Sequence, residues 1–175
     1  MIYRAQVAVA DVDRGYYADH ALTLARHPSE TEERMMVRLL AFALHADPDL
    51  VFGRGLSSED EADLSRSDDT GQLQLWIEVG LPEEKWVRKA AARTRRMVLI
   101  LYGGSRANQW WRQNAASLER FEHLSVLQCD EEGTRALARL ADRNMTLSCT
   151  IQEGDVLVSD GRQSATVKVT VLKAV

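Results

Sequence analysis

Three carboxylates have positions in the chain at which they could serve catalysis or metal binding: Glu33, Asp60 and Glu78. Glu78 lies near the end of the apolar run LQLWIEV, and ligand sites in open α/β sheets gather beyond the carboxyl ends of strands. On a helical wheel, Glu33 falls at the edge of an apolar helix face, so its carboxylate should point toward the sheet, unless it only pairs with an arginine at the rim. Asp60 belongs to a strongly acidic segment. These three side chains are the candidate site.

The charges of the chain are segregated on either side of Glu78. Residues 57–69 hold six carboxylates and only one cation, whereas residues 85–96 hold six cations and no anion. The net charge of −4 argues against a general nucleic-acid coat protein. An acidic loop and a basic helix nevertheless flank the candidate site, so an anionic partner fits the local pattern.

A second group of residues suits contact with nucleic acid. Arg106 and Arg112 flank Trp110 and Trp111 in the segment SRANQWWRQN. The arginines could contact phosphates while the indoles stack on unpaired bases. Adjacent tryptophans in an amphipathic helix also fit a simpler arrangement, with one ring in the core and the other at its rim.

Length and composition predict one globular domain over residues 1–175. The chain has 175 residues, of which 45% are hydrophobic and 27% charged. We expect a cytoplasmic protein without membrane contact, because the sequence contains neither a secretory signal pattern nor a long enough apolar run. Cys129 and Cys149 lie outside any C-x-x-C motif and are expected to be buried apolar residues. Serine-hydrolase and phosphate-loop motifs are missing from the sequence.

The amino-terminal third predicts two strands and a helix. Residues 3–9 alternate apolar with polar side chains, which is typical of a strand, and residues 20–25 form a short partner strand after a turn. Ser29 followed by Glu32 forms a capping box, which predicts a helix from there to about His45. The buried face of that helix is expected to hold Met35, Met36, Leu39, Leu40 and Ala43, with Arg34, Arg38 and His45 on the opposite side.

The remaining sequence alternates strands and helices. Predicted strands cover residues 50–57, 73–80, 97–103 and 123–129, and three further extended segments cover 145–152, 155–159 and 165–172. Predicted helices cover residues 82–94, 105–117 and 130–142. The apolar run at 97–103 favours a strand that is covered on both faces. The expected fold is therefore α/β, with a mixed central sheet flanked by helices.

Several long blocks of the sequence closely resemble the YaeQ family of small bacterial proteins. The blocks are LTLARHPSETEERMMVRLLAFAL, FGRGLSSEDE, LWIEVGLPEEKWVRKA, SRANQWW and ADRNMTLSCTIQ, and together they span nearly the entire chain. The resemblance implies a variant of the PD-(D/E)XK nuclease architecture, a restriction-endonuclease-like core with extra β-strands from both termini. It implies this fold more firmly than any activity.

The resemblance also implies a set of site residues. A nuclease of this architecture uses a helix glutamate, a strand aspartate and a Glu-x-Lys pair, to which Glu33, Asp60 and Glu78 correspond here, with Glu61 a less favoured substitute for Asp60. Asp60 and Glu78 would then bind Mg²⁺, which activates water and stabilises the charge that develops on phosphorus.

The sequence departs from that pattern at the lysine. Gly80 stands where Glu-x-Lys would place the amine. Lys89, which shares a helix face with Lys85, is the candidate replacement. The same lysine also fits a solvated basic stripe with Arg88 and Arg93.

Two functions follow from these expectations. The first is a Mg²⁺-dependent phosphodiesterase acting on nucleic acid, with Glu33, Asp60, Glu78 and Lys89 as its catalytic residues. The second is a non-catalytic module that binds nucleic acid or protein on a degenerate nuclease scaffold, with a link to transcription. The arrangement of the carboxylates in the folded chain bears on the choice between them.

Overall fold

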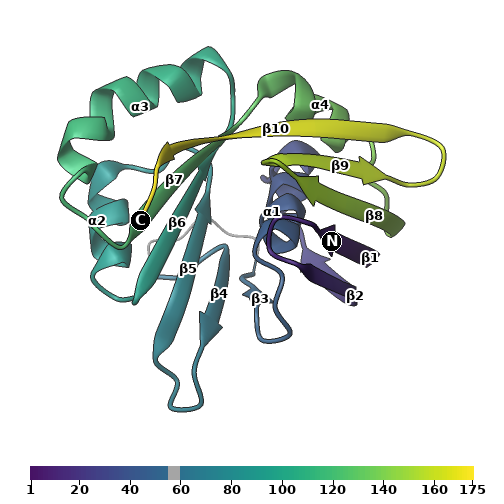
Figure 1. The fold of residues 1–175 in the computed structure, drawn as a ribbon, viewed down its shortest axis with the longest axis horizontal. Coiled ribbons are helices and arrows are strands. Elements are labelled where there is room, and N and C mark those ends of the chain that lie inside the picture. The colour runs from purple at the N-terminus through teal and green to yellow at the C-terminus, as the bar shows by residue number, and fades with distance from the viewer. Residues whose placement is uncertain (55–59) are drawn as a thin grey trace.

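The structure is a computed structural model that describes residues 1–54 and 60–175. Within these residues the chain forms a mixed α/β fold of ten strands and four helices (Figure 1). The strands are β1 (Ile2–Asp11), β2 (Tyr16–Ala25), β3 (Val51–Phe52), β4 (Leu64–Ser67), β5 (Leu73–Val79), β6 (Arg96–Leu101), β7 (Leu124–Cys129), β8 (Asn144–Gln152), β9 (Asp155–Ser159) and β10 (Ser164–Lys173). The helices are α1 (Glu32–Leu44), α2 (Glu84–Ala91), α3 (Ser105–Leu118) and α4 (Glu131–Ala138).

All ten described strands belong to one mixed sheet, in the order β2-β1-β8-β9-β10-β7-β6-β5-β4-β3. The long strand β10 joins its two parts, because residues 164–168 pair with β9 and residues 169–173 pair with β7. Strands β5, β6 and β7 run parallel to one another. Their carboxyl ends therefore meet at one edge of the sheet, which is the place that sequence reasoning assigned to a site.

The sheet curves around α1 (Figure 1). The Phe42 ring on α1 stacks on Phe52 of β3 at a centroid distance of 5.6 Å and meets His20 of β2 edge-on at 5.0 Å. Since β2 and β3 are the two ends of the strand order, one side chain of the central helix contacts both edges of the sheet.

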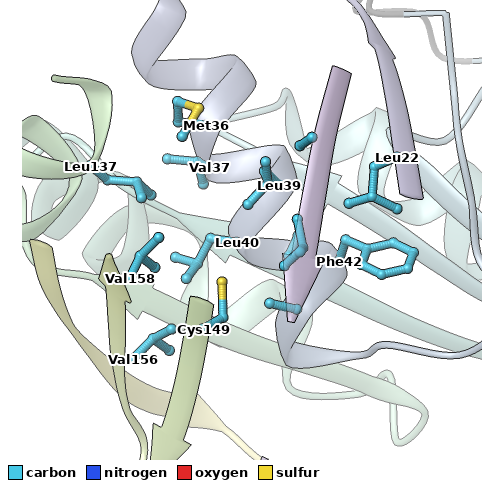
Figure 2. Packing of buried hydrophobic residues seen from close by; sticks show 14 of the residues in the cluster. Leu22, Met36, Val37, Leu39, Leu40, Phe42, Leu137, Cys149, Val156 and Val158 are labelled. Atoms are coloured by element: carbon cyan, nitrogen blue, oxygen red, sulfur yellow. The ribbon is translucent and has the colours of Figure 1, made fainter. Parts of the chain in front are cut away.

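Beyond its first turn, helix α1 is buried on every side. All residues from Met35 to Ala43 are buried, and Figure 2 shows Leu40 beside Cys149 and Val158 of the neighbouring strands. The prediction that Arg38 lies on a solvent-facing side is wrong, because the curved sheet and α4 leave this part of the helix no such side. The Arg38 side chain is instead fully buried.

Helices α2 and α3 cover the other face of the parallel strands. Val87 and Ala90 of α2 and Ala107 of α3 belong to a second hydrophobic cluster with the β6 residues Met97 and Leu99. This arrangement confirms that the apolar run of β6 is covered on both faces.

Most predicted elements are confirmed to within a few residues, with three differences. Helix α1 begins at Glu32 with Thr31 as its N-cap, whereas the capping box placed the start at Ser29. The strand predicted over 50–57 is only Val51–Phe52, and its part from 55 to 57 lies outside the described residues, as does Glu59 of the acidic segment. Strand β4 was not predicted.

The two cysteines are confirmed as buried. Burial raises the pKa of both thiols to about 12, so neither forms a thiolate near neutral pH. Among the described residues, no helix combines the length and apolar character that crossing a membrane requires.

Candidate functional site

A cleft of about 720 Å³ opens at the carboxyl ends of β5 and β6. The start of α1, the loop between β5 and α2, and the first turns of α3 and α4 complete its walls. The cleft residues that matter for its chemistry are Glu33, Arg34, Glu78, Val79, Gly80, Trp86, Tyr102 and Arg106. The cleft thus combines carboxyl groups, guanidinium groups and aromatic rings.

Arg34 is the least exposed of the three arginines that line this cleft. Its Nη2 donates to both carboxylate oxygens of Asp63, each at 2.9 Å, and to the carbonyl oxygen of Val79 at 3.2 Å. Its Nη1 donates to Glu30 at 2.6 Å. Burial works against its charged form, yet the charges and hydrogen bonds of Asp63 and Glu30 raise the pKa of Arg34 above the usual value for arginine. The guanidinium is therefore a permanent charge.

Asp63 ties this cation to β5. The residue is buried at 4% exposure, directly before β4, which pairs with β5 through Leu64 and Ile77. Besides Arg34, its carboxylate accepts a hydrogen bond of 2.8 Å from the backbone N–H of Val79. The end of β5 and the start of β4 are thus held to α1 by one carboxylate.

Glu78 lies beside Asp63 in surroundings that favour its uncharged form. The Trp76 Nε1–H donates to Glu78 Oε1 at 2.8 Å. Burial, followed by the nearby Asp63 charge, raises the pKa of Glu78 to about 9, while the Trp76 hydrogen bond opposes that rise. A proton on this carboxyl also allows Glu78 to share a hydrogen bond with Asp63, which raises its pKa further.

A second buried arginine completes the charge network. Arg38 donates to the two Glu30 oxygens at 2.7 and 3.0 Å and to the carbonyl oxygen of Ala25 at 2.9 Å. Glu30 is itself buried, at 6% exposure. The carboxylates of Glu30 and Asp63 face the guanidinium groups of Arg34 and Arg38, so the network balances its own charge.

The structure brings some of the predicted site residues together and leaves others apart. Glu33 and Glu78 both line the cleft, where Glu33 accepts a hydrogen bond of 2.9 Å from the Thr134 hydroxyl. Asp60 and Lys89 are exposed and are not among the residues that line the cleft. Glu61 forms an exposed ion pair with Arg54.

Gly80 lines the cleft in a conformation that suits glycine. Its φ is +112°, which L side chains rarely adopt, although an added Cβ would meet no atom within 4 Å. Space is therefore not what keeps a lysine from this position. The backbone itself disfavours the amine of a Glu-x-Lys pair here.

Sequence reasoning missed Asp63 and Arg34. Asp63 is one of several carboxylates in a short acidic stretch, and nothing in its spacing distinguishes it from Asp60. No signal in the sequence marked it, because the polar strand LSRS that Asp63 precedes is recognisable only in the folded chain, where it pairs with β5. Arg34 was placed on the outer side of α1.

The site as it stands fits an arginine better than a divalent ion. Within residues 1–54 and 60–175, no three His, Cys, Asp or Glu side chains are grouped so as to hold a metal. The oxygens of Asp63 and Val79 that could ligate an ion already bind the Arg34 guanidinium. Glu78, the acid next to Asp63, has its pKa raised by burial, which favours its uncharged form.

Fold and site together define a class: mixed α/β proteins with a curved sheet around a central helix and a charged cleft at the ends of parallel strands. The YaeQ protein family model matches residues 1–169. The chain is 46% identical to the uncharacterized protein YaeQ of Salmonella typhi and 44% identical to that of Escherichia coli K12, each over 97% of this chain and 93% of the relative. The chain belongs to the YaeQ family.

Solved structures agree with this assignment. The crystal structure of YaeQ from Xanthomonas axonopodis pv. citri matches with a TM-score of 0.96 and 49% identity, over 99% of this chain and 98% of that one. The YaeQ structure from Pseudomonas syringae matches with a TM-score of 0.93 and 34% identity, over 100% and 97%. The curved mixed sheet with four helices is thus a fold that solved YaeQ structures share.

Proposed function

We propose that this protein is a non-catalytic nucleic-acid-binding module on a variant of the PD-(D/E)XK, restriction-endonuclease-like fold. The observation that carries the proposal is the Arg34 guanidinium, which bonds to Asp63 and to the Val79 carbonyl beside Glu78. Phosphodiester hydrolysis at such a site depends on a divalent ion held by these oxygens. An arginine bound to these oxygens supports a site that keeps its charged residues but does not catalyse hydrolysis.

Nucleic acid as the partner is supported by the basic face next to the cleft. Lys85, Arg88 and Lys89 are exposed on α2, while Val87 and Ala90 of the same helix face the sheet. Trp86 of α2 and Arg106 of α3 line the cleft itself. Cations that track a phosphate backbone beside an aromatic ring that stacks on bases are typical of single-strand binding.

Fluorescence anisotropy with labelled single-stranded DNA and RNA tests the proposal over a range of salt concentrations. The wild-type protein should bind with an affinity that falls as salt rises. The double variant Arg88→Ala/Lys89→Ala should bind more weakly, with a salt slope reduced by up to about 2. The matched control Arg4→Ala/Arg162→Ala removes the same charge from exposed positions on β1 and on the β9–β10 turn and should leave binding unchanged.

Two results would overturn this function. Absence of binding to both nucleic acids at low salt would leave the protein-binding role as the better account of the scaffold. Cleavage of the oligonucleotide in Mg²⁺ or Mn²⁺, abolished by Glu78→Gln, would instead support the Mg²⁺-dependent phosphodiesterase.

A further inference from the structure

Glu33 and Arg106 differ from the other acidic and basic side chains that line the cleft. The others are engaged by neighbouring side chains: Arg34 by Glu30 and Asp63, Glu131 by Arg135, Glu83 by Lys85, and Glu78 by the Trp76 indole. Within the described part of the chain, Glu33 and Arg106 form no ion pair, either with each other or with a third side chain. The cleft therefore offers a ligand one carboxylate and one guanidinium.

The two charged groups come from different walls of the cleft. Glu33 lies in the first turn of α1, where its Oε2 accepts a hydrogen bond of 2.9 Å from the hydroxyl of the fully buried Thr134. This bond fixes the carboxylate, and each carboxylate oxygen can accept more than one hydrogen bond, so Glu33 keeps acceptor capacity on both oxygens. Arg106 lies in the first turn of α3 and is exposed.

Two aromatic rings lie in the same cleft. Trp86 of α2 and Tyr102, which directly follows β6, both line it and are partly buried. Aromatic side chains in such positions stack on the faces of nucleobases. The cleft volume of about 720 Å³ lies within the range of roughly 300 to 1,000 Å³ that encloses small organic ligands. These features together fit a planar aromatic ligand with hydrogen-bond donors and acceptors on its edges.

Guanine is the nucleobase whose edges match a carboxylate and a guanidinium. Its N1–H and its N2 amino group are adjacent donors, which the two oxygens of one carboxylate accept together. Its O6 and N7 are adjacent acceptors, the pair that an arginine contacts through two hydrogen bonds. Adenine, cytosine and thymine or uracil do not combine these two pairs.

We propose that the cleft binds a single unstacked guanine of a nucleic-acid strand. Glu33 accepts from N1–H and the N2 amino group, Arg106 donates to O6 and N7, and the rings of Trp86 and Tyr102 contact the faces of the base. This inference rests on the proposed nucleic-acid-binding function and adds base specificity to it. Phosphate contacts on α2 hold any strand, whereas the cleft selects which base enters.

Short labelled oligothymidines with one central base changed test this proposal by fluorescence anisotropy. Wild type should bind the strand with a central guanine at least about ten-fold more tightly than strands with adenine, cytosine or thymine there. Hypoxanthine lacks the N2 amino group and 7-deazaguanine lacks N7, so each should lose most of this preference. These measurements use the wild-type protein and do not depend on the folding of a variant.

Two variants test whether the preference arises in the cleft. Glu33→Gln should bind the guanine and hypoxanthine strands with nearly equal affinity, because its amide has one acceptor oxygen for the two donors. Arg106→Gln should in the same way fail to distinguish guanine from 7-deazaguanine. The ratio of two affinities is compared in each protein, because loss of a charge changes the affinity for every strand.

Glu32→Gln and Arg112→Gln are the matched controls. They remove the same charges from α1 and α3 at exposed positions that are not among the residues lining the cleft. Both variants should keep the guanine preference of wild type.

The possible failures of the two proposals are distinguishable. Equal binding of the four strands by wild type, or preference for another base, would overturn the guanine site and leave the nucleic-acid-binding function standing. Absence of binding to every strand at low salt would overturn both. A guanine preference that is unchanged in Glu33→Gln and Arg106→Gln would show that another surface reads the base, and would also overturn the guanine site.

Discussion

At the scale of single residues, Glu78 makes the stability of the protein depend on pH. Its pKa is raised above that of a carboxyl in the unfolded chain, to about 9. For such a group the stabilisation is fully present below the unfolded pKa of about 4.5 and is lost as pH rises through the folded value. The free energy of unfolding of wild type should therefore decline across this window.

Glu78→Gln is expected to remove this decline. The amide can accept from Trp76 and donate to Asp63 as the protonated acid does, but it cannot lose a proton. Urea unfolding should be measured at several pH values between 5 and 9. As pH rises, the free energy of unfolding of Glu78→Gln should increase relative to that of wild type, by at most about 1.4 kcal/mol per pH unit. Parallel curves for the two proteins would show that Glu78 is already ionised at pH 5.

Arg38 should carry a large share of the stability. It is fully buried, and its Nη1 is, within the described part of the chain, a buried nitrogen without a hydrogen-bond partner. Arg38→Met leaves Glu30 with one cation fewer in a dry environment, so we expect a loss of about 3 to 5 kcal/mol in urea unfolding. Arg88→Met breaks an exposed pair with Glu84 and should change stability by less than about 1 kcal/mol. A cost for Arg38→Met as small as that of the control would contradict the buried network.

The sequence identified Glu33 and Glu78 as cleft residues but could not identify their neighbours. Glu78 was recognisable because a carboxylate at the end of an apolar strand is conspicuous. Arg34 and Asp63 acquire their positions only when α1 packs against the start of β4, a contact between segments about 30 residues apart. A helical wheel assumes that one side of the helix faces solvent. The residues that this assumption placed wrongly are those that the curved sheet surrounds.

At the scale of elements, the start of α1 bears directly on the site, since Glu33 and Arg34 lie in its first turn. Thr31 caps the helix by accepting a hydrogen bond of 3.1 Å from the Arg34 N–H. Ser29 lies before the cap, with its hydroxyl 2.6 Å from His27 Nδ1.

Thr31→Ala is therefore expected to cost about 1 kcal/mol, as loss of an N-cap does. Ser29→Ala, the matched change at the residue that the capping-box pattern favoured, should cost clearly less. Thermal or urea unfolding of the two variants decides between the two caps. A larger loss of stability for Ser29→Ala would show that Ser29 is the N-cap of the helix.

Strand β4 shows why element prediction stops where it does. Its sequence, LSRS, has only four residues and one apolar side chain. It is a strand because β5 on one side and β3 on the other supply hydrogen-bonding partners. Long apolar or alternating runs such as β1 and β6 are recognisable alone, whereas a short polar strand depends on tertiary pairing.

At the scale of the molecule, Phe42 links the two edges of the sheet. Removal of the Phe42 ring should destabilise both parts of the sheet together. Phe42→Ala is therefore expected to lower the free energy of unfolding by about 3 to 5 kcal/mol. Tryptophan fluorescence reports on the part containing β5 to α3, because all four tryptophans lie between residues 76 and 111, while far-ultraviolet circular dichroism reports on the whole fold. If Phe42→Ala unfolds in the same transition by both probes, the result would support the prediction of one domain over residues 1–175.

Val51→Ala is the control for Phe42→Ala. Val51 lies on β3 beside Phe52 but is 56% exposed, so the change should cost less than about 1 kcal/mol. Separate transitions for the two probes in Phe42→Ala would show instead that the two parts of the sheet unfold independently.

The parallel pairing of β1 with β8 affects how the chain folds during its synthesis on the ribosome. Arg4 pairs with Asn144, so the hydrogen-bonding partner of the first strand is synthesised about 140 residues after it. The β1–β2 hairpin emerges early with one long edge of β1 unpaired, and unpaired edges recruit other strands. Contacts so distant in sequence also form slowly. The nascent chain thus spends most of its synthesis with its first strand unprotected, and this interval is when a chaperone has most to contribute.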